Sequence, residues 1–372
     1  MIIRNSLTRH TLARRVLIVL LLAVVPAAAQ TTANLPTDRI EKIEKAITAA
    51  MSRQNIPGLS VAVVTDQKLR WSNGYGLADL ENYIPAKTAT VYRLGSISKT
   101  ITAIAVMQLV ERGKLDLDAP VQKYCPAFPQ KQWPVTTRQL LGHLAGVRHY
   151  KSDAEFLSTR HYNSVAEGLE MFKDDPLLHE PGTKYQYTTH GYTILGCAVE
   201  GASGMKFADY VQENIFKPAG MNRMRVDDVF EIIPNRAQGY FKTSSGELRN
   251  STLADTSYKI PGGGFCSTVE DLARFAIAVQ TGMLVRKETL AQMWTAQKTR
   301  EGKATSYGLG WGLSERNSLK EVAHGGAQQR VSTNLYMIPE KGLAVVLMVN
   351  LENAGGSLGA LSKEIADILL AQ

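Results

Sequence analysis

The chain has 372 residues and a formal net charge of +8, from 42 lysines and arginines against 34 aspartates and glutamates. A chain of this length can hold one large domain or two closely packed ones with a sizeable core. Four arginines and no acid precede residue 30, and removing them leaves a net charge of +4. Neither a basic run nor an aromatic-basic pattern remains, so the composition argues against nucleic-acid binding.

The first 29 residues have the pattern of a secretory signal peptide. The four arginines lie within residues 4–15, an uninterrupted apolar run follows at residues 16–25, and Pro26-Ala27-Ala28-Ala29 ends the segment. The run is too short to span a bilayer comfortably, so no stable membrane span is expected. We expect cleavage after Ala29 and a periplasmic or secreted mature protein. An arginine-rich, acid-free start also fits a mitochondrial presequence, which stays open as an alternative.

The rest of the chain alternates between helical and β-rich blocks. Apolar residues at helical spacing predict a helix at residues 39–53, and two β-rich runs follow at 59–65 and 68–75. The middle of the chain is mainly helical, with predicted helices at residues 96–110, 136–144, 191–201, 208–216, 267–280 and 287–294. Strands return at residues 307–313, 321–328, 332–338 and 343–350, before a closing amphipathic helix at 358–370.

Strands at both ends of the chain, with helices between them, predict a mixed α/β (α+β) fold. The simplest packing is one antiparallel sheet built from both ends, covered by the terminal helices, with a helical domain inserted. We expect one domain over residues 30–372, with a sheet subdomain at about 37–95 and 300–372 and a helical subdomain at about 96–299. A site would then lie between the sheet edge and the helical part, where pockets commonly form.

The tetrad Ser96-Ile97-Ser98-Lys99 opens a predicted helix that is apolar on nearly every face, as buried helices are. A serine and a lysine three residues apart share one face of a helix, so the amine can reach the hydroxyl. Burial lowers the pKa of a lysine, and the free N–H groups at a helix start favour a developing anion. Alone, this short motif could mean only that Ser96 caps a helix. With partners elsewhere in the chain it would be a Ser-Lys nucleophile.

The cysteines and histidines form no metal or disulfide pattern. The three cysteines, Cys125, Cys197 and Cys266, contain no C-x-x-C, and no histidine or cysteine group has metal-ligand spacing. Cys197 lies in an apolar helical stretch and Cys266 beside a run of glycines, so buried thiols are expected at both. We expect no metal and no cofactor.

Two further segments complete a set of motifs. Tyr187-Thr188-Thr189 lies in a polar, aromatic loop, and His324-Gly325-Gly326 lies in a predicted strand, where glycines often mark a close approach. With the tetrad at Ser96, their order and spacing resemble S-x-x-K, Y-x-N and K-T-G or H-x-G of the serine β-lactamase and penicillin-recognising family. The resemblance covers about residues 37–370 and is to the branch of class C β-lactamases, D-alanyl-D-alanine carboxypeptidases and family VIII esterases. Shorter phrases resemble the filament-forming serine β-lactamase-like proteins of animal mitochondria, among them Arg148-His149-Tyr150 and Thr256-Ser257-Tyr258-Lys259.

The resemblance implies a β-lactamase/transpeptidase-like fold and a serine hydrolase that works through an acyl-enzyme. Ser96 would attack a carbonyl, and Lys99 and Tyr187 would share proton transfer, with the primary base left open between them. The backbone N–H groups of Ser96 and Ala327 would form the oxyanion hole. His324 would be a further catalytic residue that orients and stabilises the substrate from the edge strand. The expected substrate-binding residues are Thr189, Gly325 and Gly326, although Thr189 could instead cap the following helix.

Three departures from the family motifs bear on the substrate. His324 replaces a lysine and removes an obligatory positive charge, Gly325 replaces a threonine, and Thr189 replaces an asparagine. These changes weaken the groups that would hold the carboxylate and amide of a β-lactam. We therefore expect hydrolysis of peptide, amide or ester bonds in small molecules or peptides, including peptidoglycan-derived ones, with β-lactamase activity poor or absent.

Two other functions stay open. One is a penicillin-binding or peptidoglycan-binding protein with little turnover. The other is a filament or scaffold protein with a relic site. The sequence makes no prediction of the oligomeric state.

Overall fold

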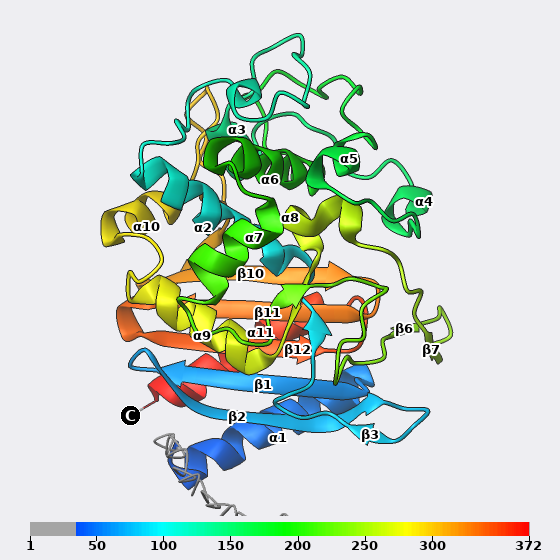
Figure 1. The fold of residues 1–372 in the computed structure, drawn as a ribbon. Coiled ribbons are helices and arrows are strands. Elements are labelled where there is room, and N and C mark those ends of the chain that lie inside the picture. The colour runs from blue at the N-terminus through cyan, green and yellow to red at the C-terminus, as the bar shows by residue number, and fades with distance from the viewer. Residues whose placement is uncertain (1–34, 372) are drawn as a thin grey trace, which may run out of the picture. The chain divides into compact units, whose positions relative to one another are not determined.

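The computed structural model describes residues 35–371, which build a β-sheet with helices on both faces and a mainly helical part beside it (Figure 1). The predicted signal segment at residues 1–29 lies outside the described residues. Within the described range, no helix is both long and apolar enough to cross a membrane.

Seven strands form one antiparallel sheet in the order β3-β2-β1-β12-β11-β10-β9. β1 pairs with β12, with Leu59 opposite Val349, so the two ends of the chain meet within the sheet. This confirms the predicted antiparallel sheet built from both chain ends. The strands are β1 (Gly58–Thr65), β2 (Lys68–Asp79), β3 (Ile84–Pro85), β9 (Gly312–Arg316), β10 (Leu319–Gln328), β11 (Val331–Ile338) and β12 (Leu343–Val349).

Successive residues of the central strands point to opposite faces of the sheet, and each face has its own apolar cluster. On one face, Val61 belongs to the cluster of the terminal helices α1 (Thr37–Gln54) and α11 (Gly355–Leu370). On the other face, Ala62 belongs to the larger cluster that includes α9 (Val269–Gln280) and the helical part. Because both faces are covered, β12 is apolar along its whole length rather than alternating.

The helical part and its connections contain the remaining elements. The helices are α2 (Ser98–Glu111), α3 (Thr137–Leu141), α4 (Asp153–Phe156), α5 (Val165–Leu169), α6 (His190–Ser203), α7 (Phe207–Val211), α8 (Ile260–Gly263) and α10 (Lys287–Met293). A three-stranded sheet contains β4 (Tyr92–Arg93), β8 (Phe265–Ser267) and β5 (Arg225–Val226), and a hairpin contains β6 (Tyr240–Lys242) and β7 (Leu248–Asn250). As predicted, α2 is buried on every face, from Ser98 to Leu109.

Three predicted elements are interrupted or shortened in the structure by their backbone conformation. The predicted strand 307–313 is mostly a loop, because Gly310 has φ +88°, which a continuous strand does not allow. The predicted helix 136–144 ends at Leu141, since His143 takes a left-handed conformation with φ 58°. The predicted helix 208–216 is divided into α7 and a π-helical turn at Gln212–Phe216.

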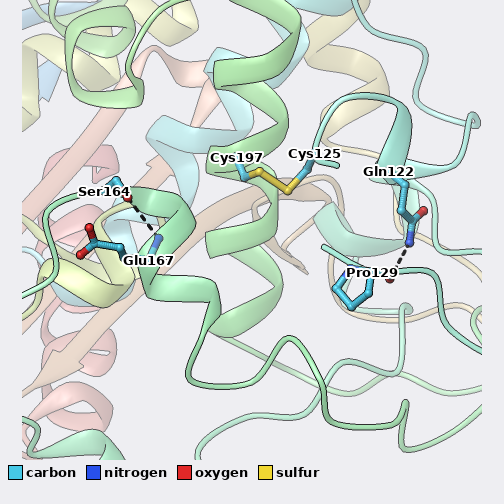
Figure 2. The surroundings of a disulfide bond; sticks show 6 residues. All are labelled: Gln122, Cys125, Pro129, Ser164, Glu167 and Cys197. Atoms are coloured by element: carbon cyan, nitrogen blue, oxygen red, sulfur yellow. Dashed lines mark hydrogen bonds between the residues drawn. A yellow bond between two sulfur atoms is a disulfide. The ribbon is translucent and has the colours of Figure 1, made fainter. Parts of the chain in front are cut away.

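A disulfide joins Cys125 to Cys197 of α6, with Cα atoms 5.3 Å apart (Figure 2). The expectation of a buried thiol at Cys197 is therefore wrong, whereas Cys266 is a buried free thiol as predicted. Spacing could not reveal the pair, because 72 residues separate the two cysteines and only the fold brings them together. Beside the bond, Ser164 caps α5 by accepting a 3.1 Å hydrogen bond from Glu167 N. The disulfide therefore fixes α6, the helix that begins directly after Thr189.

Replacing both cysteines, Cys125→Ala with Cys197→Ala, should lower the free energy of unfolding by about 4 kcal/mol in the chain-entropy model for a loop of this length. Urea unfolding of the double variant, with reduced wild type beside it, measures the loss. Cys266→Ala is the matched control because it removes a buried thiol without opening a cross-link, and it should cost less. Three reactive thiols, instead of one, in denatured but unreduced wild type would contradict the bond.

Candidate active site

The turn that carries Ser96 is pressed against the sheet. Ser96 lies in a 3-10 turn (Gly95–Ile97) that leads directly into α2. Gly95 has φ +53°, and a Cβ there would lie 2.9 Å from Ala327 N, so the position requires glycine. The backbone at Ser96 therefore lies beside the backbone of β10 at Ala327.

The two glycines of His324-Gly325-Gly326 have different surroundings. A Cβ on Gly326 would lie 2.0 Å from Leu94 O and 2.2 Å from Thr333 Oγ1, which itself donates a 2.9 Å hydrogen bond to Leu94 O. Gly326 thus permits the close approach expected of a glycine in a strand. A Cβ on Gly325 would lie 3.8 Å from Thr333 O, its nearest neighbour outside the adjacent residues. The space at Gly325 would therefore accept a side chain.

Lys99 lies in the first turn of α2 with its side chain fully buried. Its Nζ is 3.0 Å from Ser96 Oγ, 3.1 Å from Thr189 Oγ1 and 2.8 Å from Gly262 O. Burial, followed by the positive charge of Lys259, holds the pKa of Lys99 well below its usual value of 10.5. No carboxylate among the described residues acts against this shift, so the neutral amine is favoured.

Tyr187 and Thr189 lie at the end of the loop that leads into α6. Burial raises the pKa of Tyr187, and its hydrogen bond with Ser96 offsets part of the rise. Lys99 Nζ lies 5.0 Å from the centre of the Tyr187 ring. Thr189 occupies the N-cap position of α6, but its side chain makes no capping hydrogen bond and faces Lys99 instead. The alternative role of Thr189 as a helix cap is thus not seen.

Two histidines without a predicted role hold this loop in place. His143 Nδ1 accepts a hydrogen bond from Thr188 N, and His149 Nδ1 accepts one from Thr189 N, each at 3.2 Å. The rings of His143 and Tyr187 lie 4.3 Å apart. Burial lowers the pKa of His143 well below its usual range and that of His149 to about 4, so both rings stay neutral and can accept. Only the fold reveals these contacts, because nothing in the spacing of the two histidines marks them.

His324 lies in the predicted strand, β10, but this strand is not the edge of the sheet. Its side chain is buried, with Nε2 2.8 Å from Tyr307 Oη and Nδ1 2.7 Å from Gly325 O. Burial lowers the pKa of His324 to about 3, so the ring is neutral. The sheet edge is β9 rather than β10, although β9 pairs with β10 only as far as Ala323. His324 braces β10 and does not line the cavity at Ser96.

A cavity of about 460 Å³ opens beside Ser96. It brings together most of the predicted site residues, namely Ser96, Tyr187, Thr189, Gly325, Gly326 and Ala327. Lys99 lies behind Ser96 and reaches it through Nζ. The lining residues without a predicted role are His149, Tyr150, Phe156, Lys259, Gly262, Gly263, Gln328 and Gly355.

The cavity combines a hydroxyl, a buried amine, a phenol and backbone N–H groups. These groups are the equipment for nucleophilic acyl transfer. Across residues 35–371, no group of three or more His, Cys, Asp or Glu side chains is placed to hold a metal ion.

Comparisons with known proteins show the family to which the chain belongs. The Beta-lactamase family model matches residues 43–370. The chain is 32% identical over 407 residues to the serine beta-lactamase-like protein LACTB, mitochondrial, of Homo sapiens, covering 80% of this chain and 74% of that protein. It is 29% identical over 319 residues to penicillin-binding protein 4* of Bacillus subtilis, covering 81% of this chain and 70% of that protein.

The fold is also similar to a solved structure from an archaeon. The octameric penicillin-binding protein homologue from Pyrococcus abyssi superposes with a TM-score of 0.77 at 26% identity, covering 90% of this chain and 78% of that chain. These matches confirm the predicted family and the predicted fold. The chain therefore belongs to the Beta-lactamase family of serine hydrolases.

Proposed function

We propose that the protein is a hydrolase that forms an acyl-enzyme at Ser96 and cleaves peptide, amide or ester bonds. The observation that carries this proposal is the 3.0 Å contact between Lys99 Nζ and Ser96 Oγ at a buried amine. A neutral amine has two N–H donors and one lone pair. Gly262 O and Thr189 Oγ1 can accept the two N–H bonds, which leaves the lone pair for the Ser96 hydroxyl.

In the first step, Ser96 Oγ attacks the carbonyl carbon while Lys99 Nζ takes its proton. The backbone N–H groups of Ser96 and Ala327 stabilise the negative oxygen that develops. Because burial raises the pKa of Tyr187, its phenol is protonated at neutral pH and suits the role of acid to the leaving group. Lys99 is thus the primary base, and its ammonium returns a proton to Tyr187. Water then attacks the acyl carbon while the neutral Lys99 amine takes one of its protons. The bond between the acyl carbon and Ser96 Oγ breaks, the proton returns to Ser96 Oγ, and the acid product leaves.

The cavity favours substrates other than β-lactams. At the K-T-G position, Gly325 supplies no hydroxyl, and His324 is neutral and is not among the residues that line the cavity. Thr189 replaces the asparagine of the motif, so no side-chain amide is available there, and its hydroxyl accepts a hydrogen bond from Lys99 Nζ. The groups that would hold a β-lactam carboxylate at this position are therefore missing.

A substrate panel on the mature protein tests the proposal. Its members are p-nitrophenyl esters, D-alanyl-D-alanine peptides, L-peptides and nitrocefin. At least one ester or peptide should be hydrolysed, and Ser96→Ala should abolish that activity. The loss of charged contacts predicts nitrocefin turnover about 10- to 100-fold slower than the best ester. Nitrocefin turnover equal to the best ester rate would contradict the proposed substrate class.

The same panel separates the other two candidate functions. A penicillin-binding protein with little turnover would accumulate a stable acyl adduct on Ser96. A scaffold with a relic site would neither turn over a substrate nor form an adduct. The buried amine of Lys99 beside Ser96 favours an enzyme that turns over its substrate rather than a slow penicillin-binding protein or an inactive scaffold.

We further propose that the mature protein is exported to the periplasm or the medium. The signal pattern at residues 1–29 supports export, and the disulfide between Cys125 and Cys197 is typical of oxidising compartments. Fractionation of cells expressing the full chain should place a product that begins at Gln30 in the periplasm or medium. A cytosolic product with its original N-terminus would contradict export.

A further inference from the structure

A second buried lysine lies in the cavity beside the first. Lys259 ends a short 3-10 turn (Ser257–Lys259) just before α8, and only 2% of the residue is exposed. It lines the cavity that contains Ser96. Burial, followed by the charge of Arg93, lowers the pKa of Lys259 to about 7, and only Asp227 acts against this shift. A buried cation is costly without a partner, so a bound anion would favour the ammonium form. The nearby Asp227 is already paired with Arg93 at 2.7 Å.

Three aromatic rings surround the ammonium of Lys259. Its Nζ lies 5.4 Å from the ring centre of Tyr150, 4.8 Å from that of Phe156 and 5.2 Å from that of Tyr258. Ring faces attract a cation but accept none of its N–H bonds in the way an oxygen does. Burial raises the pKa of Tyr150 to about 12, so this phenol remains neutral and does not cancel the charge. The rings hold the ammonium in place and leave its N–H donors available to a ligand.

The amide of Gln328 is a second donor without a partner. Gln328 ends β10, is 5% exposed and lines the same cavity, and its buried Nε2 makes no hydrogen bond to a described residue. A Cβ built on Gly263 would lie 3.5 Å from Gln328 Oε1, 3.6 Å from Lys259 Cδ and 3.7 Å from Lys259 Cε. The two side chains therefore converge on the space above Gly263.

The first turn of α11 adds to this positive region. Gly355 begins this 16-residue helix, lines the cavity and has no side-chain cap before it. The N–H groups at a helix start favour a negative ligand. A cation, an amide and a helix start thus face one cavity. A single positive charge with amide donors suits a singly charged carboxylate better than a phosphate dianion.

We propose that Lys259 and Gln328 form a subsite that binds a carboxylate of the substrate. This inference rests on the proposed function, since the substrate is defined as an acyl donor to Ser96. The carboxylate belongs either to the acyl group or to the leaving group, and the subsite makes such substrates preferred over neutral ones of the same shape. It uses residues other than His324 and Gly325 of the altered motif, although Gly325 and Gln328 lie on the same strand and line the same cavity.

Matched ester pairs distinguish the two positions of the carboxylate. For the acyl group, the pair is the p-nitrophenyl monoester of adipic acid and the same ester with the free acid replaced by a primary amide. For the leaving group, the pair is 3-carboxyphenyl phenylacetate and 3-carbamoylphenyl phenylacetate. In one pair at least, kcat/KM should favour the carboxylate about 10- to 100-fold, as expected for a hydrogen-bonded charge, with the difference mainly in KM.

Two variants test the residues independently. Lys259→Met keeps the length of the side chain among the aromatic rings and should reduce the carboxylate-to-amide ratio about 10-fold or more. Gln328→Leu should reduce the same ratio by a smaller factor, and it keeps the test open if the lysine variant does not fold. Lys123→Met is the matched control, because Lys123 lies over the Tyr124 ring and does not line the cavity. Its ratio should equal that of wild type.

The subsite fails if both members of both pairs are hydrolysed equally by wild type. It also fails if Lys259→Met leaves the preference unchanged. Either result leaves the proposed function standing, because Ser96-dependent hydrolysis of the neutral esters is measured in the same assay. No hydrolysis of any member would instead overturn the proposed function, and the subsite with it.

Discussion

Lys99→Met should lower the rate of Ser96 acylation by at least about a thousandfold while the protein still folds. The substitution removes the amine whose Nζ lies 3.0 Å from Ser96 Oγ. Methionine has nearly the length of lysine and suits a buried position in α2. The free energy of unfolding should therefore change by no more than about 3 kcal/mol, mainly because Gly262 O and Thr189 Oγ1 lose a donor.

Stopped-flow acylation by a p-nitrophenyl ester and urea unfolding measure the two effects separately. Lys123→Met serves again as the matched control, and its acylation rate should equal that of wild type. Acylation within about tenfold of the wild-type rate in a folded Lys99→Met protein would remove Lys99 from the mechanism, since general bases contribute more than this.

Tyr187→Phe should slow amide hydrolysis by about 100- to 10,000-fold. The phenol is the proposed acid that protonates the leaving nitrogen, and an amide nitrogen cannot leave as an anion. A p-nitrophenolate leaves without a proton, so p-nitrophenyl esters should lose far less activity. The phenylalanine ring keeps the 4.3 Å packing against His143, and the loop should stay in place.

The comparison of p-nitroanilide peptides with p-nitrophenyl esters measures this difference. Tyr185→Phe is a suitable control, because Tyr185 lies on the same loop and does not line the cavity. Equal losses on both substrate types would show that Tyr187 acts earlier, as the base for Ser96. That result would reverse the assignment of base and acid between Lys99 and Tyr187.

The sequence was most informative where local spacing and chemistry coincide. The three-residue spacing of Ser96 and Lys99 brings the amine to the hydroxyl, and the apolar run after it predicts burial of the helix. Gly326 is a second case, because a glycine inside a strand predicts a close approach and Leu94 O supplies it. One sheet built from both chain ends was also predictable, because strands occur at both ends of the chain with helices between them, whereas the order of the strands was not.

The remaining parts of the site depend on contacts between distant segments. The sequence around Lys259 does not predict that its side chain is buried. The burial arises because Tyr150 and Phe156, more than 100 residues earlier in the chain, pack over it in the fold. The disulfide has the same origin, since Cys125 and Cys197 meet only in the fold. The contacts of His324 were equally hidden from the sequence. The motif predicts its strand, but the 2.8 Å contact between its Nε2 and Tyr307 Oη appears only in the fold.

Labelling with a fluorophosphonate probe, followed by peptide mass spectrometry, is the most direct test of the nucleophile. We expect one covalent adduct on the peptide that contains Ser96, no adduct in Ser96→Ala, and greatly slowed labelling in Lys99→Met. Ser98→Ala is the control within the same peptide, because Ser98 is buried and does not line the cavity, and its labelling should match wild type. An adduct that persists in Ser96→Ala, or a folded wild-type protein that is not labelled, would contradict Ser96 as the nucleophile.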